Sequence, residues 1–172
     1  MSLSQLLVDI ASQYPSAVKQ PFKEHPLASL IRNDLVAALK GLIEQGAAQY
    51  LVKGSAGQGR WSESPWAAVM NPVVTDSAEG GYYPVYLFSG DFSKVSFVMG
   101  QGTYDIRREF GREGPEILRM RGTLLRKRVP EYANNFSEGP FPIKSSSHAG
   151  GDWETASAWG KTYVVNEMPS DG

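Results

Sequence analysis

The run YYPVYLF at residues 82–88 constrains the fold more than any other segment, because every position in it is apolar or aromatic. Successive side chains of a β-strand point to opposite faces, so Tyr83, Val85 and Leu87 share one face and the other four residues share the opposite face. A strand that is apolar on both faces is typical of the centre of a sheet covered on each side. We therefore expect one face to meet helices and the other to be free to border a cavity.

Short runs rich in Val, Tyr, Phe and Trp surround this segment, and clusters of Gly, Pro, Ser and Asp separate them. This pattern predicts strands near residues 49–53, 66–70, 81–89 and 94–100, and a further strand over 162–165. The link SGDFS is short and turn-rich, which makes the strands on either side of it an antiparallel hairpin. Strands joined by such short links favour an antiparallel sheet.

Three segments show the helical spacing of apolar residues. The first covers residues 2–14 and should end at Pro15, the second covers 26–46, and a third, basic helix should follow Gly114-Pro115. The stretch 130–151 is rich in Pro, Gly, Asn and Ser and is expected to be a loop. The predicted fold class is α+β: a mostly antiparallel, twisted sheet packed against N-terminal helices, with a further basic helix and a long C-terminal loop region.

The length of 172 residues matches one ordinary domain, and 41% apolar residues suffice for a continuous core. We expect a single domain over residues 1–172, with a helical part at 2–48, a core sheet at 49–104, and a basic helix, loops and a final strand at 105–172. The end of the chain, from residue 166, has the composition of a linker to a missing effector domain.

The sequence has no run of eighteen apolar residues and no signal-peptide pattern, which favours a cytoplasmic protein without membrane contact. It contains no cysteine and only two histidines, His25 and His148. Disulfides, thiol chemistry and a Cys/His metal cage are therefore excluded. We expect neither a metal nor another cofactor.

The net charge of −1 conceals an uneven distribution along the chain. Residues 107–128 contain eight basic and three acidic side chains, a local charge of +5. Such a block is expected for a polyanion partner, since each neutralised phosphate releases condensed counterions. The alternative is the solvated face of a helix. The candidate nucleic-acid contacts in the block are Arg107, Arg108, Arg119, Arg126 and Lys127.

The motifs that carry catalysis are not found in this sequence. The glycine-rich segment GSAGQGRW, residues 54–61, is not followed by Lys-Ser/Thr and does not stand between a strand and a helix, so it does not fit a nucleotide-binding loop. His148 lies near Asp152, but without a nucleophile or a metal motif a lone histidine is expected to hydrogen-bond or stack. We therefore interpret the chain as a binding domain without catalytic residues.

Aromatic residues are prominent in this chain, and some of them can form a binding cavity. Trp66 begins the strand next to the 82–88 run, so it borders the face that carries Tyr83 and Leu87. Trp and Tyr side chains can hold a planar ring by stacking and can read its edges by hydrogen bonds. The alternative is that all these aromatic side chains simply pack in the core.

The run GQGRWSESPWAAVMNPVVTDSAEGGYYPVYLFSGDFSKVSFVMGQG, residues 57–102, resembles the N-terminal domain family of McrB-like, modification-dependent restriction proteins. The shared features, in order, are a glycine-containing loop, Pro-Trp, a strand similar to Gly-Tyr-Tyr-Pro-Val, an acidic-Phe turn and a strand ending near glycine. The resemblance implies a specificity domain joined to a nuclease or GTPase motor domain in one parent chain. It also implies recognition of 5-methylcytosine or 5-hydroxymethylcytosine flipped out of double-stranded DNA.

By the same resemblance, the base pocket falls on Trp66, Tyr83 and Leu87, and a further pocket aromatic falls on His148 or Trp153. The loop expected to approach the DNA and to help fill the gap left by the flipped base comprises Gly57, Gln58, Gly59, Arg60, Trp61 and Ser62. Two other functions remain as alternatives. One is a reader of modified RNA with a similar aromatic cage, and the other is a protein-interaction domain whose basic block contacts an acidic partner.

Overall fold

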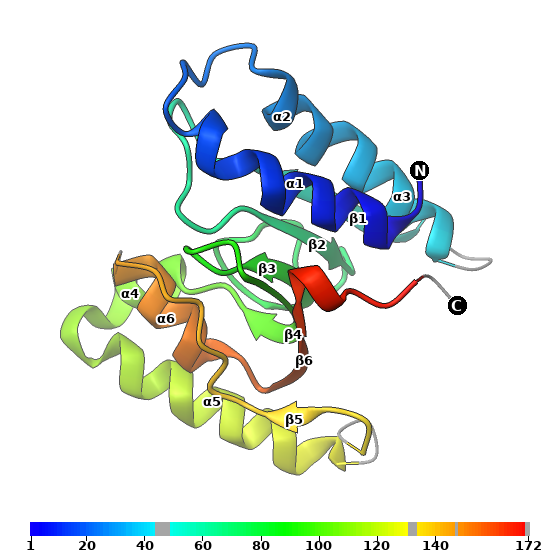
Figure 1. The fold of residues 1–172 in the computed structure, drawn as a ribbon. Helices are drawn as coiled ribbons and strands as arrows, with labels where there is room; N and C mark the ends of the chain where they lie inside the picture. Colours follow the sequence, from blue (N-terminus) through cyan, green and yellow to red (C-terminus); the bar gives the residue numbers. More distant parts are fainter. Residues whose placement is uncertain (44–48, 131–133, 147, 171–172) are drawn as a thin grey trace.

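The structure is a computed structural model that describes residues 1–43, 49–130, 134–146 and 148–170, although not the side chains of His148 and Ala149. Its centre is a six-stranded antiparallel sheet with the order β1-β2-β3-β4-β6-β5. The strands are β1 (Leu51–Ser55), β2 (Trp66–Met70), β3 (Tyr82–Phe88), β4 (Lys94–Gln101), β5 (Ser137–Glu138) and β6 (Trp159–Val164). Helices pack around the sheet, so the α+β fold class is confirmed (Figure 1).

The strand β3 lies inside the sheet, as its doubly apolar sequence predicts. Tyr83, Val85 and Leu87 pack in one buried cluster, whereas Phe88 packs in a second cluster with the N-terminal helices. The predicted alternation of faces is therefore confirmed. Trp66 pairs directly with Leu87 across the β2–β3 ladder, which places the two side chains on the same face.

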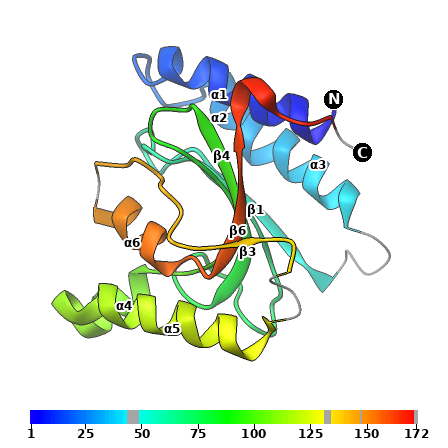
Figure 2. The same ribbon diagram turned by 60° about the horizontal axis from the view of Figure 1, so that its bottom comes forward.

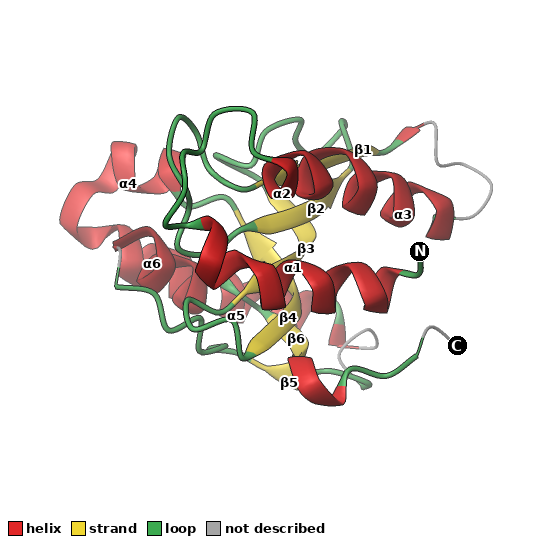
Figure 3. Ribbon diagram, turned by 45° about the horizontal axis from the view of Figure 1, so that its top comes forward, coloured by secondary structure: helices red, strands yellow, loops and turns green. Residues whose placement is uncertain are grey.

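The N-terminal helices cover one face of the sheet (Figure 3). They are α1 (Leu3–Ala17), α2 (Pro26–Ser29), a π-helical turn (Leu30–Asp34) and α3 (Leu35–Leu42). The second helical segment begins at Pro26, as predicted, because a proline in the first turn gives up no intrahelical hydrogen bond. The prediction that it continues to Gly46 is wrong, because the helix ends at Leu42 and Ile43 already has an extended backbone, with a ψ angle of 112°.

The prediction that Pro15 stops the first helix is wrong. The helix continues to Ala17, and the N–H of Val18 still donates to the carbonyl of Tyr14. Proline removes one backbone donor and disturbs the turn before it, which usually ends a helix. Here Tyr14 and Ala17 are both buried, so packing against the sheet holds the last turn in place.

The other helices lie beyond the opposite side of the sheet (Figure 2). They are α4 (Tyr104–Phe110), a 3₁₀ turn (Gly111–Glu113), α5 (Gly114–Arg128) and α6 (His148–Ala156). The sequence predicts α5, the basic helix, but not α4. None of the helices in the described part of the chain is long and apolar enough to cross a membrane.

The predicted loop over residues 130–151 is wrong at two places, because β5 lies within it and α6 begins before its end. The glycine-containing start of α6 has a weak intrinsic preference for helix. Tertiary contacts compensate for this weakness. The Glu154 carboxylate accepts hydrogen bonds from the backbone N–H groups of Ile143 and Lys144, at 2.6 and 3.0 Å. The strand predicted over 162–165 is present as β6.

After β6 the chain runs back toward α1 (Figure 1). Met168 packs against the cluster of the N-terminal helices, and the Ser4 hydroxyl donates to the carbonyl of Pro169 at 2.6 Å. These contacts tie residues beyond 166 to the body of the domain. The linker expected from that position stays a prediction.

Candidate functional site

A small cavity lies between the sheet and α6, on the face that carries Tyr83 and Leu87. Four of the residues expected to form a base pocket line it together: Trp66 from β2, Tyr83 and Leu87 from β3, and Trp153 from α6. The remaining wall of this aromatic cavity consists of Val85, Gly100, Gln101, Ala156 and Ser157. The side chain of His148, the other candidate for the C-terminal wall, lies outside the described residues.

Strand register explains why these side chains meet. Trp66 lies opposite Leu87, and Tyr83 lies opposite Gly100 on β4. Since glycine has no side chain, the space next to the Tyr83 ring is left open. A Cβ atom at position 100 would lie 3.3 Å from Cγ1 of Val85, so even a methyl group there would crowd the floor of the cavity.

The aromatic cavity is narrow. Its free volume is about 10 Å³, which is about enough for a single water molecule. A pyrimidine ring is several times larger and does not fit while Trp153 and α6 hold these positions. Binding of a planar ligand therefore requires the wall formed by α6 to move away from the sheet.

Two polar contacts hold the α6 wall in place. The Arg107 guanidinium forms a bidentate pair with the Asp152 carboxylate, with distances of 2.6 Å from Nε and 2.7 Å from Nη2. This carboxylate hydrogen bond raises the pKa of Arg107, which stays charged. At the other anchor, the Glu154 carboxylate binds the backbone ahead of the helix. Arg107, expected to contact nucleic acid, is thus engaged in an ion pair within the protein, although its side chain is 35% exposed.

The Tyr83 hydroxyl donates to the carbonyl of Ala78 at 2.7 Å. Burial raises the pKa of this phenol well above its ordinary value, because the ionised form would lose its hydration. Tyr83 is therefore a neutral side chain with its hydrogen already engaged. The Ser157 hydroxyl is engaged in the same way and donates to the carbonyl of Trp153 at 2.9 Å.

The loop between β1 and β2 presents an exposed tip on an anchored base. Gln58, Gly59 and Arg60 are exposed. Gly57 and Gly59 have φ angles of 125° and 68°, a backbone conformation that other residues rarely adopt.

The base of the same loop is fixed to the N-terminal helices. The Trp61 ring packs edge-on against Tyr14, Phe22 and His25 at centroid distances of 4.9–5.1 Å, and its indole N–H donates to the carbonyl of Gln20. The N–H of Ser62 donates to the carbonyl of Ala56. Of the six loop residues expected near nucleic acid, Gln58, Gly59 and Arg60 are the most accessible.

The basic block divides into engaged and exposed side chains. Arg126 donates to the carbonyl of Ala158 at 2.8 Å and lies 3.7 Å from the Glu138 carboxylate. Arg108 is exposed and pairs with Asp105 one turn away. Arg119 and Lys127 are exposed and form no ion pair within the described part of the chain.

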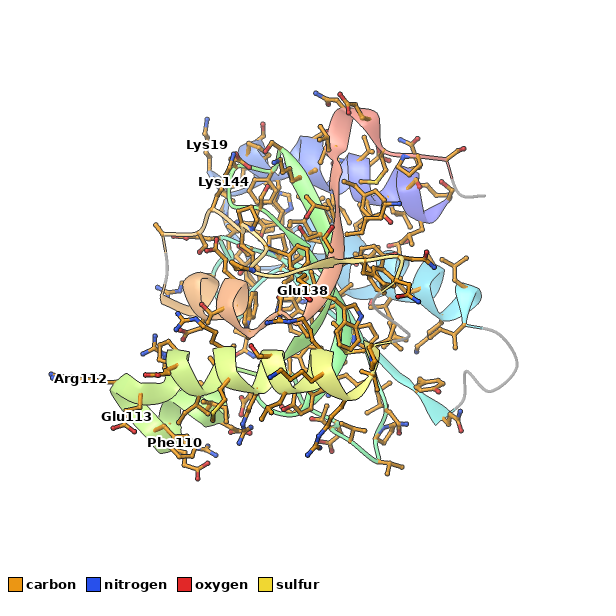
Figure 4. All side chains as sticks on the ribbon, turned by 90° about the horizontal axis from the view of Figure 1, so that it is seen from below. Lys19, Phe110, Arg112, Glu113, Glu138 and Lys144 are labelled. Carbon is orange, nitrogen blue, oxygen red and sulfur yellow. The ribbon has the colours of Figure 1, made fainter. Side chains whose placement is uncertain are left out.

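Arg112, which sequence patterns did not single out, is also exposed and projects from the edge of the molecule between α4 and α5 (Figure 4).

A larger apolar groove, with a volume of about 620 Å³, lies on the other face of the sheet. Tyr82, Phe97 and Trp159 contribute aromatic rings to it. None of the expected pocket residues whose side chains the structure describes lines this groove, because strand alternation directs Tyr83 and Leu87 away from it. The smaller aromatic cavity is therefore the candidate site.

Sequence reasoning missed Gln101, Ala156 and Ser157, which complete the cavity wall. The only sign of these residues in the sequence was Gln101, a polar residue directly after the apolar strand predicted over 94–100. Ala156 and Ser157 offered none, since only the placement of α6 brings them to the sheet.

An antiparallel sheet with an aromatic cavity on one face and exposed cations on a neighbouring helix has the architecture of a binding domain. A family model described as "MrcB-like, N-terminal domain" matches residues 9–172. The chain therefore belongs to this family, the McrB-like N-terminal domains that its sequence resembles. Domains of this family bind DNA and are not catalytic. No curated protein matches the chain.

Proposed function

We propose that this domain recognises modified cytosine in double-stranded DNA by taking the flipped base into the aromatic cavity. The observation that carries the proposal is the convergence of Trp66, Tyr83, Leu87 and Trp153, from three separate elements, on one small cavity. Two aromatic walls can stack on a pyrimidine, while Leu87 offers an apolar surface to a substituent on carbon 5.

Because the cavity is smaller than a base, recognition includes an opening step. The α6 wall swings outward with Trp153, the base enters, and the indole returns onto its exposed face. Arg107 and Glu154, which anchor α6, define the position to which the wall returns. We assign these two residues to positioning the pocket rather than to binding DNA.

The free energies involved require contacts outside the cavity. Flipping costs a few kcal/mol, and stacking contributes about 1–3 kcal/mol per base, so the two nearly balance. Burial of a methyl group adds about 0.8 kcal/mol. Exposed cations, in particular Arg108, Arg119 and Lys127, supply the remaining affinity through phosphate contacts that are the same for every sequence.

The exposed loop tip fits the other requirement of base flipping, which is to support the duplex where the base has left. We propose that Gln58, Gly59 and Arg60 approach the DNA there. The anchored Trp61 fixes the height of the tip relative to the start of β2, and hence relative to Trp66.

In the parent protein, we propose, this domain selects the DNA for a nuclease or GTPase motor domain of a modification-dependent restriction system in the cytoplasm. The domain itself needs no cofactor for this role.

The test is a fluorescence titration with three duplexes that differ at one cytosine: unmodified, 5-methylated and 5-hydroxymethylated. We expect tighter binding to at least one modified duplex, and enhanced fluorescence of a 2-aminopurine placed beside the modified base, which reports its unstacking. A single-stranded RNA with the same modification serves as competitor. Equal affinity for all three duplexes would falsify the proposal, and preferential binding of the RNA would replace it with RNA recognition.

A further inference from the structure

The apolar groove on the other face of the sheet has no role in the proposed recognition of DNA. Its volume is about 620 Å³, within the range of about 300–1,000 Å³ that is usual for ligand sites. The N-terminal helices pack on the part of this face that carries Phe88 and Val95. Tyr82, Phe97 and Trp159 share the face by strand register, but they line the groove. Within the described residues, the N-terminal helices therefore cover this face only in part.

A second, mostly apolar pocket of about 480 Å³ adjoins the groove on the same face. Tyr86 lines the second pocket and Phe97 lines the groove, and their ring centroids are 4.7 Å apart. On β6, Trp159 lines the groove and Tyr163 lines the second pocket. Four residues of a strand span about 13 Å. The two spaces together form an elongated surface, the apolar trough, whose shape suits an extended or helical segment of a chain.

Aliphatic side chains make up much of the trough and reach the surface at its rim. Val69, Met99 and Leu125 line the groove beside the aromatic rings. Val74, on the groove wall, is 54% exposed, and Leu124 of α5 is 48% exposed. Contiguous apolar surface of this kind marks interaction sites on soluble proteins. Single-stranded nucleic acids bind instead to aromatic stacking platforms, so the aliphatic lining favours a protein partner.

Two arginines of α5 stand beside the groove. Arg121 and Arg128 lie about one helical turn before and after Leu125, so they share the side of the helix that faces the groove. Neither forms an ion pair in the part of the chain that the structure describes. Arg119 and Lys127, proposed to contact DNA, lie on the other side of α5 by helical spacing. The basic block therefore presents its cations in two directions.

A third cation lies within the trough. Lys161 is exposed between Trp159 and Tyr163 on β6, and its Nζ lies 5.4 Å from the centroid of the Tyr163 ring. No acidic side chain among the described residues lines either pocket. The carboxylate of Glu138, on the neighbouring strand β5, lies 3.7 Å from Arg126. The trough thus combines an apolar floor with a positive border, and its complement is both apolar and acidic.

We propose that the apolar trough is a docking surface for a partner protein, through a segment in which apolar side chains are interspersed with Asp and Glu. The apolar side chains enter the groove and the second pocket, and their burial supplies the affinity. The carboxylates pair with Arg121, Arg128 and Lys161, which fixes the orientation of the segment and rejects basic segments. The trough and the aromatic cavity lie on different faces of the sheet, so this inference does not rest on the proposed function.

The test begins with a selection from random peptides of about 16 residues, about 24 Å long as helices, displayed on phage and captured by the immobilised domain. The selected peptides should combine Leu, Ile, Phe or Trp with Asp or Glu. Their affinities are then measured in solution by fluorescence anisotropy. A failure to select any peptide, or a selection dominated by basic peptides, overturns the proposal.

Two neighbouring valines locate the binding surface. Val74→Glu places a carboxylate on the groove wall and should weaken a selected peptide about tenfold, because it meets the acidic residues of the peptide beside apolar surface. Val73→Glu is the matched control, since Val73 is 93% exposed and does not line the groove. It should weaken binding less than about twofold. Urea denaturation checks that both variants fold. Equal effects of the two changes would show that the peptide binds elsewhere.

Two neighbouring cations test the positive border. Arg128→Glu should weaken the same peptide about tenfold, whereas Lys127→Glu, on the other side of α5, should weaken it less than about twofold. A peptide with Lys in place of its acidic residues should recover binding to the Arg128→Glu domain. If the two reversals weaken the peptide equally, it binds the basic block as a whole and the trough is not its site.

A single-stranded oligothymidylate distinguishes nucleic acid from protein as the occupant. It carries negative charge but no aliphatic side chains, so it should not displace a selected peptide from the trough. If it displaces the peptide, and if its own binding is weakened by Val74→Glu, the trough is a nucleic-acid site and the assignment to a protein partner is wrong.

Discussion

Two buried tyrosines occupy the two faces of the sheet and differ in how completely their surroundings are filled. Tyr14, among the N-terminal helices, stacks on Phe92 at a centroid distance of 4.4 Å, and its hydroxyl lies 3.0 and 2.9 Å from the carbonyls of Ala56 and Ser62. Tyr83 faces a glycine across the strand pair, beside the aromatic cavity.

Burial raises the pKa of both phenols, so both remain neutral donors. The two tyrosines differ in how much space their surroundings leave for a ligand. Around Tyr14 the ring has aromatic partners and the hydroxyl has two acceptors, and this cluster leaves nothing for a ligand to supply. Around Tyr83, by contrast, space is left over. We infer that the first cluster provides stability and the second provides recognition, and the following changes test that division.

The largest effect on folding should come from Tyr14→Ala. Removing a fully buried ring costs about 3–5 kcal/mol in the free energy of unfolding, measured by urea denaturation. Tyr14→Phe, which removes only the hydroxyl, should cost about 1–2 kcal/mol. The phenylalanine variant should keep the preference for modified DNA. A change of preference without a change of stability would show that the helix-side cluster also takes part in recognition.

Trp66→Ala should affect recognition of modified DNA more than folding. Trp66 is only partly buried, and stacking on a base is worth about 1–3 kcal/mol, so the preference for modified over unmodified duplex should fall to about one. Salt-sensitive binding common to all duplexes should persist. Trp159→Ala is the matched control, because this tryptophan lies in the same sheet but lines the groove on the other face. If both variants lose the preference alike, the aromatic cavity is not its source.

Replacing exposed cations of α5 should change the affinity for DNA without changing the preference for modified over unmodified duplex. Arg119→Ala and Lys127→Ala should each weaken binding to every duplex and reduce the slope of log affinity against log salt by about 0.9 for each phosphate that is no longer neutralised. Arg126→Ala is the comparison, since Arg126 is held by the carbonyl of Ala158. It should lower stability and leave the slope unchanged. A slope that falls only in Arg126→Ala would reverse the assignment.

The smallest effect should appear at the hairpin between β3 and β4. Hydrogen bonds from Lys144, and then from Ser89 and Ser93, hold the pKa of Asp91 well below its ordinary value. A carboxyl whose pKa is lower when folded stabilises the protein above its unfolded pKa of about 4, and this stability is lost as pH falls further.

Asp91→Asn should therefore lower the free energy of unfolding at pH 6 and narrow the difference from the unchanged domain at pH 3. Because both charged partners are substantially exposed, solvent and salt weaken the effect. An equal loss of stability at the two pH values would show that hydrogen bonding by the neutral form, and not charge, is responsible.

Sequence patterns predicted the sheet because its determinants are local. Alternation in residues 82–88 assigned Tyr83 and Leu87 to one face, and the start of the neighbouring strand placed Trp66 beside them. The helix after Gly114-Pro115 followed from a proline signal in the same way.

Residue patterns alone did not predict the C-terminal wall of the cavity, since α6 depends on contacts with distant residues. Trp153 was expected there only through the family resemblance, as one of two candidates. Asp152 is held by Arg107, and Glu154 binds backbone that precedes the helix by several residues. The same pairing explains why charge counting overestimates the block at 107–128. Two of its arginines, Arg107 and Arg126, form bonds inside the protein that only the fold reveals.

The small volume of the aromatic cavity limits which molecules can bind to the domain. When opening must come before occupancy, the apparent dissociation constant equals the intrinsic one divided by the fraction of molecules that are open. Under the proposed function, a duplex would hold the domain through its phosphates while the cavity opens, whereas a free nucleoside would have no such hold. We therefore expect modified nucleosides released by DNA turnover neither to occupy nor to inhibit the domain.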